Sequence, residues 1–382
     1  MEQEELTASR LMERAAGSTG MDDFGDPAFQ DWLDLLTWSL REESDLNERG
    51  HRVATAMLQA KLAVRLRVIH AHREYPEIAE QPVEAPIFII GMPRTGSTFM
   101  HHLFGQDRAL RVPRRWELHH PWPPPEPATY FSDPRIALHN QEMLSIDDGR
   151  PKLAAMHPMR GDFPEECVHL LTPTFASTLY WVLFSVPQYE TALPGWDLEP
   201  AYRFHRMFLQ LLQWRYPASP WVLKYPGHVG HLDVLSKVYP DARFVWLHRD
   251  PVASIASVTH LTWLAHTAHQ RHTEAAAIAA RIARDYADRM RVSMEQRARL
   301  ETADRPWCDV RYEDFVGDPV QCIQRIYKWA HLDLSDESAK RMQAYVDQPP
   351  YPRGGYKNDV QELGVDAAWI REAFKHYTDS FL

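Results

Sequence analysis

The pattern of apolar positions along the chain predicts helices near the N-terminus and a parallel β-sheet after them. Before residue 85, apolar side chains recur at helical spacing over Asp31–Arg41 and over Arg52–Ala71, without the alternation of a half-buried strand. Short continuous apolar runs follow, in the form of strands buried on both faces. These runs are Ile87–Ile90, Trp221–Leu223, Phe244–Leu247 and Trp307–Val310. Each of the first three precedes a turn and a helical pattern, whereas the fourth does not.

Strands that alternate with helices indicate βαβ units, so we expect an α/β fold in which helices flank a parallel sheet. The first 85 residues (1–85) are expected to form a helical N-terminal segment packed on a core domain of residues 86–382. From Glu165 to Tyr216 the pattern is mostly helical and is interrupted by prolines. We therefore interpret residues from about 128 to 216 (128–216) as a helical insertion in the core domain.

Composition and charge exclude several classes of protein. Of the 382 residues, 45% are hydrophobic and 25% are charged, as in folded globular domains. The chain contains 42 Lys and Arg residues and 52 Asp and Glu residues, which gives a formal net charge of −10. We therefore expect no nucleic-acid-binding surface, and any anion site must be a local pocket. Three cysteines without a CxxC pair form no disulfide or zinc framework. The N-terminus lacks signal-peptide features and no run has the length of a transmembrane segment, so a cytoplasmic protein is expected.

The first predicted strand leads into a loop with the features of a phosphate site. The loop consists of Gly91, Met92, Pro93, Arg94, Thr95, Gly96, Ser97 and Thr98. Two glycines let successive N–H groups point at an anion, and the helix start adds partial positive charge. The spacing nearly matches the nucleotide-hydrolase pattern GxxxxGK followed by Ser or Thr, but Ser97 takes the lysine position and the cation has moved to Arg94. An ordinary βα turn, with Ser97 or Thr98 capping the helix, is the alternative interpretation.

This loop, within PIFIIGMPRTGSTFMHHLF, resembles the 5′-phosphosulfate loop of the sulfotransferases that use 3′-phosphoadenosine 5′-phosphosulfate (PAPS). The second family element consists of a strand that is followed by an arginine, with a serine eight residues after that arginine. The segment FVWLHRDPVASIASV matches this element, with Arg249 as the arginine and Ser257 as the serine. PEECVHLL, WVLKYPGH and VRYEDFVGDP are similar to the bacterial branch with a helical N-terminal segment. The resemblance implies a P-loop-type fold, PAPS as the cofactor, 3′,5′-ADP as the product, and no metal.

The resemblance also implies which residues hold the cofactor. The 3′-phosphate would lie at Arg249 and Ser257, with Tyr312 near the adenine. Asp250 is a good N-cap and Pro251 a good first helical residue, so Ser257 is expected on the helix face that Arg249 borders. The residues assigned to the 5′-phosphosulfate are Arg94, Thr95, Gly96, Ser97 and Thr98. A surface arginine, a solvated helix serine and a half-buried tyrosine are the alternative interpretations.

Sulfuryl transfer needs a base that takes the proton of the acceptor. Glu117, in RRWELHHP, occupies a position in the sequence similar to that of a glutamate base in some family members, and we favour it as the base. A loop carboxylate paired with Arg114 or Arg115 is the alternative. His228 is the second candidate, although it is displaced by two positions from the Lys-x-His element of the cytosolic branch, and it could instead cap a helix or bind substrate.

Two cations are expected to act on the leaving group. Lys224 ends a predicted buried strand, at the sheet edge where α/β proteins bind ligands, and the family resemblance implies that it contacts the transferring group. Arg94 is expected to stabilise the leaving phosphate. A lysine that points outward from the strand end is the alternative interpretation.

The acceptor itself is not readable from the sequence. An aromatic-rich segment after Glu117 and the helical insertion are expected to line its pocket, which favours a hydroxyl, less an amine, of a small-molecule or lipid acceptor. Neighbouring histidines lack an HExxH or carboxylate set, so no metal is expected. We interpret Arg353–Lys357 as a surface loop. Two other function classes remain open: a P-loop nucleotide kinase or NTPase, and a non-catalytic nucleotide-binding protein.

Overall fold

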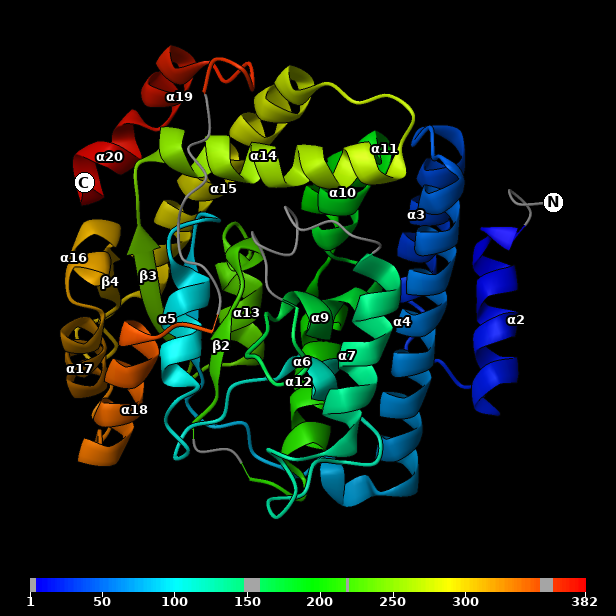
Figure 1. Ribbon diagram of the computed structural model, residues 1–382, viewed down its shortest axis with the longest axis horizontal. Helices are drawn as coiled ribbons and strands as arrows, with labels where there is room; N and C mark the ends of the chain where they lie inside the picture. The colour runs from blue at the N-terminus through cyan, green and yellow to red at the C-terminus, as the bar shows by residue number, and fades with distance from the viewer. Residues whose placement is uncertain (1–4, 148–158, 218–219, 351–359) are drawn as a thin grey trace.

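Four parallel strands form a sheet whose carboxyl ends share one edge (Figure 1). A computed structural model describes residues 5–147, 159–217, 220–350 and 360–382. The strands are β1 (Ile87–Gly91), β2 (Val222–Lys224), β3 (Arg243–His248) and β4 (Cys308–Arg311). They lie in the order β2-β1-β3-β4, and the register sets Ile89 beside both Lys224 and Val245. The first loop and the end of β2 are thereby neighbours.

The four predicted apolar runs form the four strands, with ends shifted by no more than one residue. Successive side chains of β1 face opposite sides of the sheet, because Phe88 and Ile90 join one apolar cluster while Ile87 and Ile89 join the other. This double burial explains why β1 appears in the sequence as a continuous apolar run.

Helices follow the strands, as predicted for βαβ units. The helices that follow the first three strands are α5 (Ser97–Phe104), α13 (Leu232–Val238) and α14 (Pro251–His269), with the 3-10 turn η4 (Pro226–His228) before α13. The prediction that none follows the fourth is wrong, since α16 (Tyr312–Gly317) begins directly after β4. This helix buries Phe315, and Glu313 and Asp314 lie in its first turn, where the helix dipole favours negative charge.

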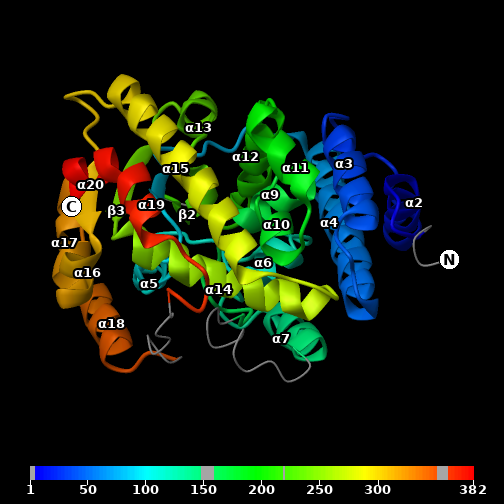
Figure 2. The ribbon, with the colours of Figure 1, turned by 90° about the horizontal axis from the view of Figure 1, so that it is seen from above.

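The N-terminal segment is helical and lies on the side of the molecule away from β4 (Figures 1 and 2). It consists of α2 (Ala8–Thr19), α3 (Phe29–Glu42), α4 (Glu48–Glu74) and the 3-10 turn η1 (Pro76–Ile78). The long helix α4 contacts α14, and its residues Leu58, Leu62 and Leu66 are buried in the same apolar cluster as Phe88 of the sheet. The segment therefore packs directly on the core.

Helices joined by turns make up the described part of the segment between residues 128 and 216. They are α7 (Pro134–Asp147), α9 (Val168–Leu171), α10 (Leu179–Leu183), α11 (Pro187–Ala192) and α12 (Glu199–Gln213), with 3-10 turns η2 (Thr172–Thr174) and η3 (Leu193–Gly195). The remaining helices are α6 (Arg115–His119), α15 (Ala275–Leu300), α17 (Pro319–Trp329), α18 (Asp336–Asp347), α19 (Ala367–Ala373) and α20 (Lys375–Phe381). Among the residues described, none of these helices combines the length and apolar character that crossing a bilayer requires.

Candidate active site

The turn between β1 and α5 has the backbone conformation of an anion-binding loop. Gly91 and Gly96 have φ angles of 134° and 84°, and Arg94 between them has a φ of 66°, a region that residues with a side chain rarely adopt. A Cβ on Gly91 would lie 2.4 Å from the carbonyl oxygen of Leu247 on β3, so only glycine fits there. Left-handed positions of this kind turn successive N–H groups toward one side, as in anion-binding nests.

Helix α5 begins at Ser97, and Gly96 is its N-cap. Neither Ser97 nor Thr98 caps this helix, contrary to the alternative interpretation, because Gly96 occupies the cap position in the left-handed conformation. The Thr98 hydroxyl instead accepts a hydrogen bond of 3.1 Å from Nζ of Lys224. The Thr95 hydroxyl is used within the turn, where it donates to the carbonyl oxygen of Met92 at 3.0 Å. Of the two threonines, only Thr98 thus joins the turn to β2.

The second predicted phosphate site is built at the junction of β3 and α14. As predicted, Asp250 is the N-cap of α14 and accepts a hydrogen bond of 2.9 Å from the backbone N–H of Val252, and Pro251 is the first helical residue. The hydroxyl of Ser257 accepts a hydrogen bond of 3.1 Å from Nε of Arg94. The structure therefore brings the serine of the second element into contact with the arginine of the first loop.

Arg249 also reaches the first loop, since its guanidinium donates a hydrogen bond to the carbonyl oxygen of Arg94. The same guanidinium lies over the ring of Tyr312 on α16, 4.0 Å from the ring centroid. A Cβ on Gly96 would lie 3.5 Å from that ring, so α16 packs closely against the loop. Four predicted cofactor residues, Arg94, Arg249, Ser257 and Tyr312, are thus direct neighbours.

Lys224 lies at the end of β2, and its side chain is almost completely buried. Its ammonium group pairs with the carboxylate of Glu166, which retains 17% of its side-chain exposure. The next residue, Cys167, donates its backbone N–H to the carbonyl oxygen of Lys224 at 2.9 Å. Glu166 was not among the site residues predicted from the sequence, although its segment PEECVHLL resembles the family. An acidic pair ahead of a short apolar run was the only local signal, and its partner lies on a distant strand.

Positive charge predominates where these elements meet. Arg94, Arg249 and Lys224 lie close together here, and among the described residues the carboxylate of Glu166 interacts with Lys224 and Arg94. Burial, and next the charge of Arg249, lower the pKa of the Arg94 guanidinium, while Glu166 acts in the opposite direction. A bound anion would offset the repulsion between the two guanidinium groups. The site is therefore suited to a ligand that carries more than one negative charge.

Glu117 is fully buried in a hydrogen-bond network of its own. One carboxylate oxygen accepts from the guanidinium of Arg111 at 2.8 Å, and the other accepts from the Tyr130 hydroxyl and from the backbone N–H of Arg114, each at 2.8 Å. The alternative of an ion pair with the side chain of Arg114 or Arg115 is corrected to Arg111, because α6 turns the carboxylate back toward the residues before the helix. To reach an acceptor, Glu117 would have to leave this network.

His228 is also fully buried, next to the aromatic rings of Phe88, Tyr202 and Tyr225. Its Nδ1 is 2.8 Å from the hydroxyl oxygen of Tyr202. Burial keeps the pKa of the imidazole well below its usual value, so the ring is neutral. The structure thus places His228 in the apolar core and not among Arg94, Lys224 and their partners. Arg353–Lys357 lies outside the described residues.

Comparison with known proteins agrees with the predicted fold. The family model described as "Sulfotransferase family" matches residues 86–336. The omega-hydroxy-beta-dihydromenaquinone-9 sulfotransferase Stf3 of Mycobacterium bovis is 26% identical over 327 residues, which span 82% of this chain and 80% of the relative. The sulfotransferase STF9 from Mycobacterium avium superposes with a TM-score of 0.91, at 27% identity over 98% of this chain and 96% of that one. The sulfotransferase STF1 from Mycobacterium tuberculosis superposes with a TM-score of 0.86, at 28% identity over 97% of this chain and 98% of that one.

The family model covers most of the chain, and the two solved structures match it from the N-terminal helices to the C-terminus. The predicted resemblance and the predicted α/β fold are confirmed. This chain belongs to the sulfotransferase family.

Proposed function

We propose that this enzyme transfers a sulfuryl group from PAPS to the hydroxyl of a lipid acceptor. One observation carries the proposal: two separate strand-to-helix junctions, β1–α5 and β3–α14, meet at Arg94. Each junction brings cationic or hydroxyl groups to the same sheet edge, and a nucleotide with phosphates at both the 3′ and 5′ positions needs two such sites. The three unpaired cysteine thiols accord with the cytoplasmic location that the sequence predicts.

In this proposal the cofactor lies across the two junctions. The turn from Gly91 to Thr98, with Arg94 and Lys224, holds the 5′-phosphosulfate. Arg249 and Ser257 hold the 3′-phosphate, and they exchange their present contacts with Arg94 for contacts with phosphate oxygens. The ring of Tyr312, which already supports the Arg249 guanidinium, lies on the adenine side.

The reaction requires one proton acceptor and stabilisation of one leaving oxygen. The acceptor oxygen attacks sulfur, the bond between sulfur and the bridging oxygen breaks, and the electron pair of that bond leaves with 3′,5′-ADP. We assign Lys224 to the bridging oxygen and Glu166 to the acceptor proton, because the two side chains are paired and Glu166 is partly exposed. Glu166 thus replaces Glu117 and His228 as the proposed base, since both of these are fully buried in other contacts.

The name of a relative supports a lipid acceptor. The curated relative from Mycobacterium bovis is named for a hydroxylated dihydromenaquinone, which is a lipid. The small cavity beside Tyr225 has a volume of about 20 Å³, which holds about one water molecule, so we do not assign the acceptor to it.

A ligand titration followed by a transfer assay tests this proposal. We expect 3′,5′-ADP to bind without a metal ion and more tightly than ATP with Mg²⁺. Incubation with PAPS labelled in the sulfuryl group should transfer the label to an isoprenoid or other lipid alcohol and not to a simple sugar. Preferential binding of ATP with Mg²⁺ would indicate a kinase or NTPase. Binding of 3′,5′-ADP without transfer to any alcohol or amine would indicate a non-catalytic nucleotide-binding protein.

A further inference from the structure

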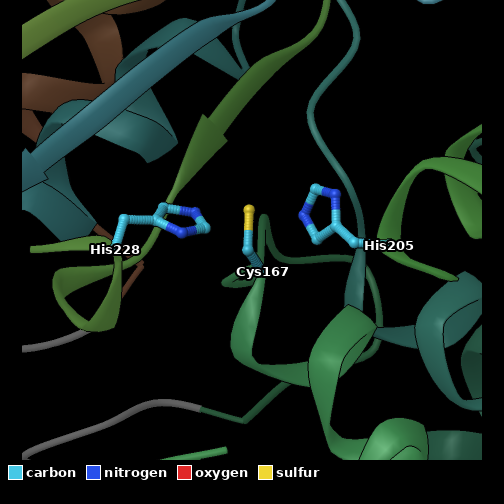
Figure 3. Close-up of side chains that lie close together, drawn as sticks. All are labelled: Cys167, His205 and His228. Carbon is cyan, nitrogen blue, oxygen red and sulfur yellow. The ribbon is translucent and has the colours of Figure 1, made fainter. Parts of the chain in front are cut away.

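Three potential metal ligands meet in the core beneath the transfer site (Figure 3). Cys167 precedes α9, His205 lies on α12, and His228 lies in η4 after β2. The sulfur of Cys167 lies between the two imidazole rings in Figure 3. One ligand atom from each residue lies within 4.8 Å of the others, and all three side chains are fully buried.

Both histidines direct an unpartnered nitrogen into this cluster. Nδ1 of His205 is 2.7 Å from the Tyr239 hydroxyl oxygen, and Nδ1 of His228 is 2.8 Å from that of Tyr202. The Nε2 atoms of both rings are buried and have no hydrogen-bond partner among the described residues. A thiol has one proton, so it can donate to one of two Nε2 lone pairs at most. A metal ion would satisfy both nitrogens together, with each Nδ1–H donating to its tyrosine.

Charge and ligand type determine which ion fits. The surrounding side chains include Phe88, Tyr202 and Tyr225, so a net charge would be costly there. A divalent ion bound to one thiolate and two imidazoles leaves one net positive charge, whereas a monovalent ion leaves none. Thiolate and imidazole are also ligands of soft copper, and three ligands suffice for cuprous ion.

We propose that Cys167, His205 and His228 form a three-coordinate site for Cu(I). Binding forms one Cu–S and two Cu–N bonds, and the thiol proton is released to solvent without any change of oxidation state. Bond lengths of about 2.0 Å to nitrogen and about 2.3 Å to sulfur require ligand atoms about 3.5 to 3.7 Å apart. Because the present separations are no more than 4.8 Å, side-chain rotations have to close them by about 1.3 Å at most.

The site has a direct connection to the proposed transfer machinery. Cys167 follows Glu166 in the chain, and its backbone N–H binds the carbonyl of Lys224, so an ion here would fix the segment that carries both residues. The ligands come from three distant segments, which is why their spacing in the sequence shows no metal motif. The copper titration uses no PAPS, so the two proposals can fail separately.

Anaerobic titration of the full chain with Cu(I), in competition with a chromophoric Cu(I) chelator, tests the site. The wild type should bind one equivalent, and Cys167→Ala or His205→Gln should weaken its binding by about 100-fold or more. Cys308→Ala is the matched control, because that cysteine lies on β4, outside the cluster, and it should bind as the wild type does. Equal binding by Cys167→Ala and the wild type would overturn the proposal, as would tighter binding of Zn²⁺ than of Cu(I) by the wild type.

X-ray absorption of the copper-loaded wild type gives a test that needs no variant. We expect one sulfur and two imidazole nitrogens around each ion. Coordination by sulfur alone, or by nitrogen and oxygen without sulfur, would overturn the assignment. This measurement decides the question even if the substituted chains fail to fold.

Discussion

Arg94 and Ser257 are joined by a hydrogen bond of 3.1 Å, although they belong to different strand-to-helix junctions. Arg94 lies in the turn after β1, and Ser257 lies on α14 after β3. Because β1 and β3 are adjacent parallel strands, both junctions open at one sheet edge, where α/β proteins bind their ligands. This contact joins two motifs that are far apart in the sequence into one candidate nucleotide site.

The turn after β1 should depend on Gly91. An alanine there would place its Cβ 2.4 Å from the Leu247 carbonyl oxygen at a φ of 134°, so we expect Gly91→Ala to lower the free energy of unfolding by about 2 kcal/mol or more and to weaken binding of 3′,5′-ADP. Gly17→Ala is the matched control, because α2 leaves space around Gly17 and alanine favours a helix by about 1 kcal/mol. Urea unfolding measures both, and a stable Gly91→Ala would contradict the steric argument.

Glu166 should affect turnover and not cofactor binding. Glu166→Gln keeps the shape of the side chain but removes the proposed proton acceptor, so kcat should fall by about 100-fold or more. The affinity for 3′,5′-ADP should not fall, because the loss of one carboxylate leaves more positive charge near the cofactor. Single-turnover kinetics and calorimetry separate these effects. An unchanged kcat would show that another group takes the proton.

Glu117 should contribute mainly to the stability of the fold and not to catalysis. Its buried carboxylate pairs with Arg111 and accepts from Tyr130, so Glu117→Ala should lower the free energy of unfolding by about 3 to 5 kcal/mol. The exposed ion pair of Glu48 and Arg52 is the control, since Glu48→Ala should change the free energy of unfolding by less than about 1 kcal/mol. If folded Glu117→Ala has the stability of the wild type and loses turnover, Glu117 is the base after all.

Glu190 should make stability depend on pH near neutrality. Burial raises its pKa to about 7, despite its ion pair with Arg281. A carboxyl group whose pKa is higher in the folded than in the unfolded chain stabilises the fold below its unfolded pKa, and that contribution is lost as the pH rises through about 7. The stability of the wild type relative to Glu190→Gln should therefore decline between about pH 5 and pH 8. Urea unfolding of both proteins across this pH range measures the decline. A stability difference that stays constant with pH would contradict the raised pKa of Glu190.

Strands β1, β2 and β3 were predictable because burial on both faces makes each of them an almost continuous apolar run, whereas the edge strand β4 buries only Val310. The contacts of the charged side chains were not predictable from the sequence, because they depend on which distant segments of the chain meet in the fold. Glu166 gains its role from Lys224 on β2, and Glu117 pairs with Arg111 because α6 turns it back toward earlier residues. His228 lies two positions from the family pattern in the sequence, and in the fold it faces the core. A one-dimensional motif located the backbone junctions, but it could not show which way these side chains point.

Calorimetric titration with 3′,5′-ADP and with 5′-AMP tests the two-junction nucleotide site most directly. In the wild type the 3′-phosphate should strengthen binding by about 10- to 100-fold, as expected for charge-assisted hydrogen bonds to Arg249 and Ser257. Arg249→Ala should remove most of that difference while leaving the affinity for 5′-AMP nearly unchanged, whereas Arg94→Ala should weaken both ligands. Equal affinities of the two nucleotides for the wild type, or an equal loss for both in Arg249→Ala, would contradict the account.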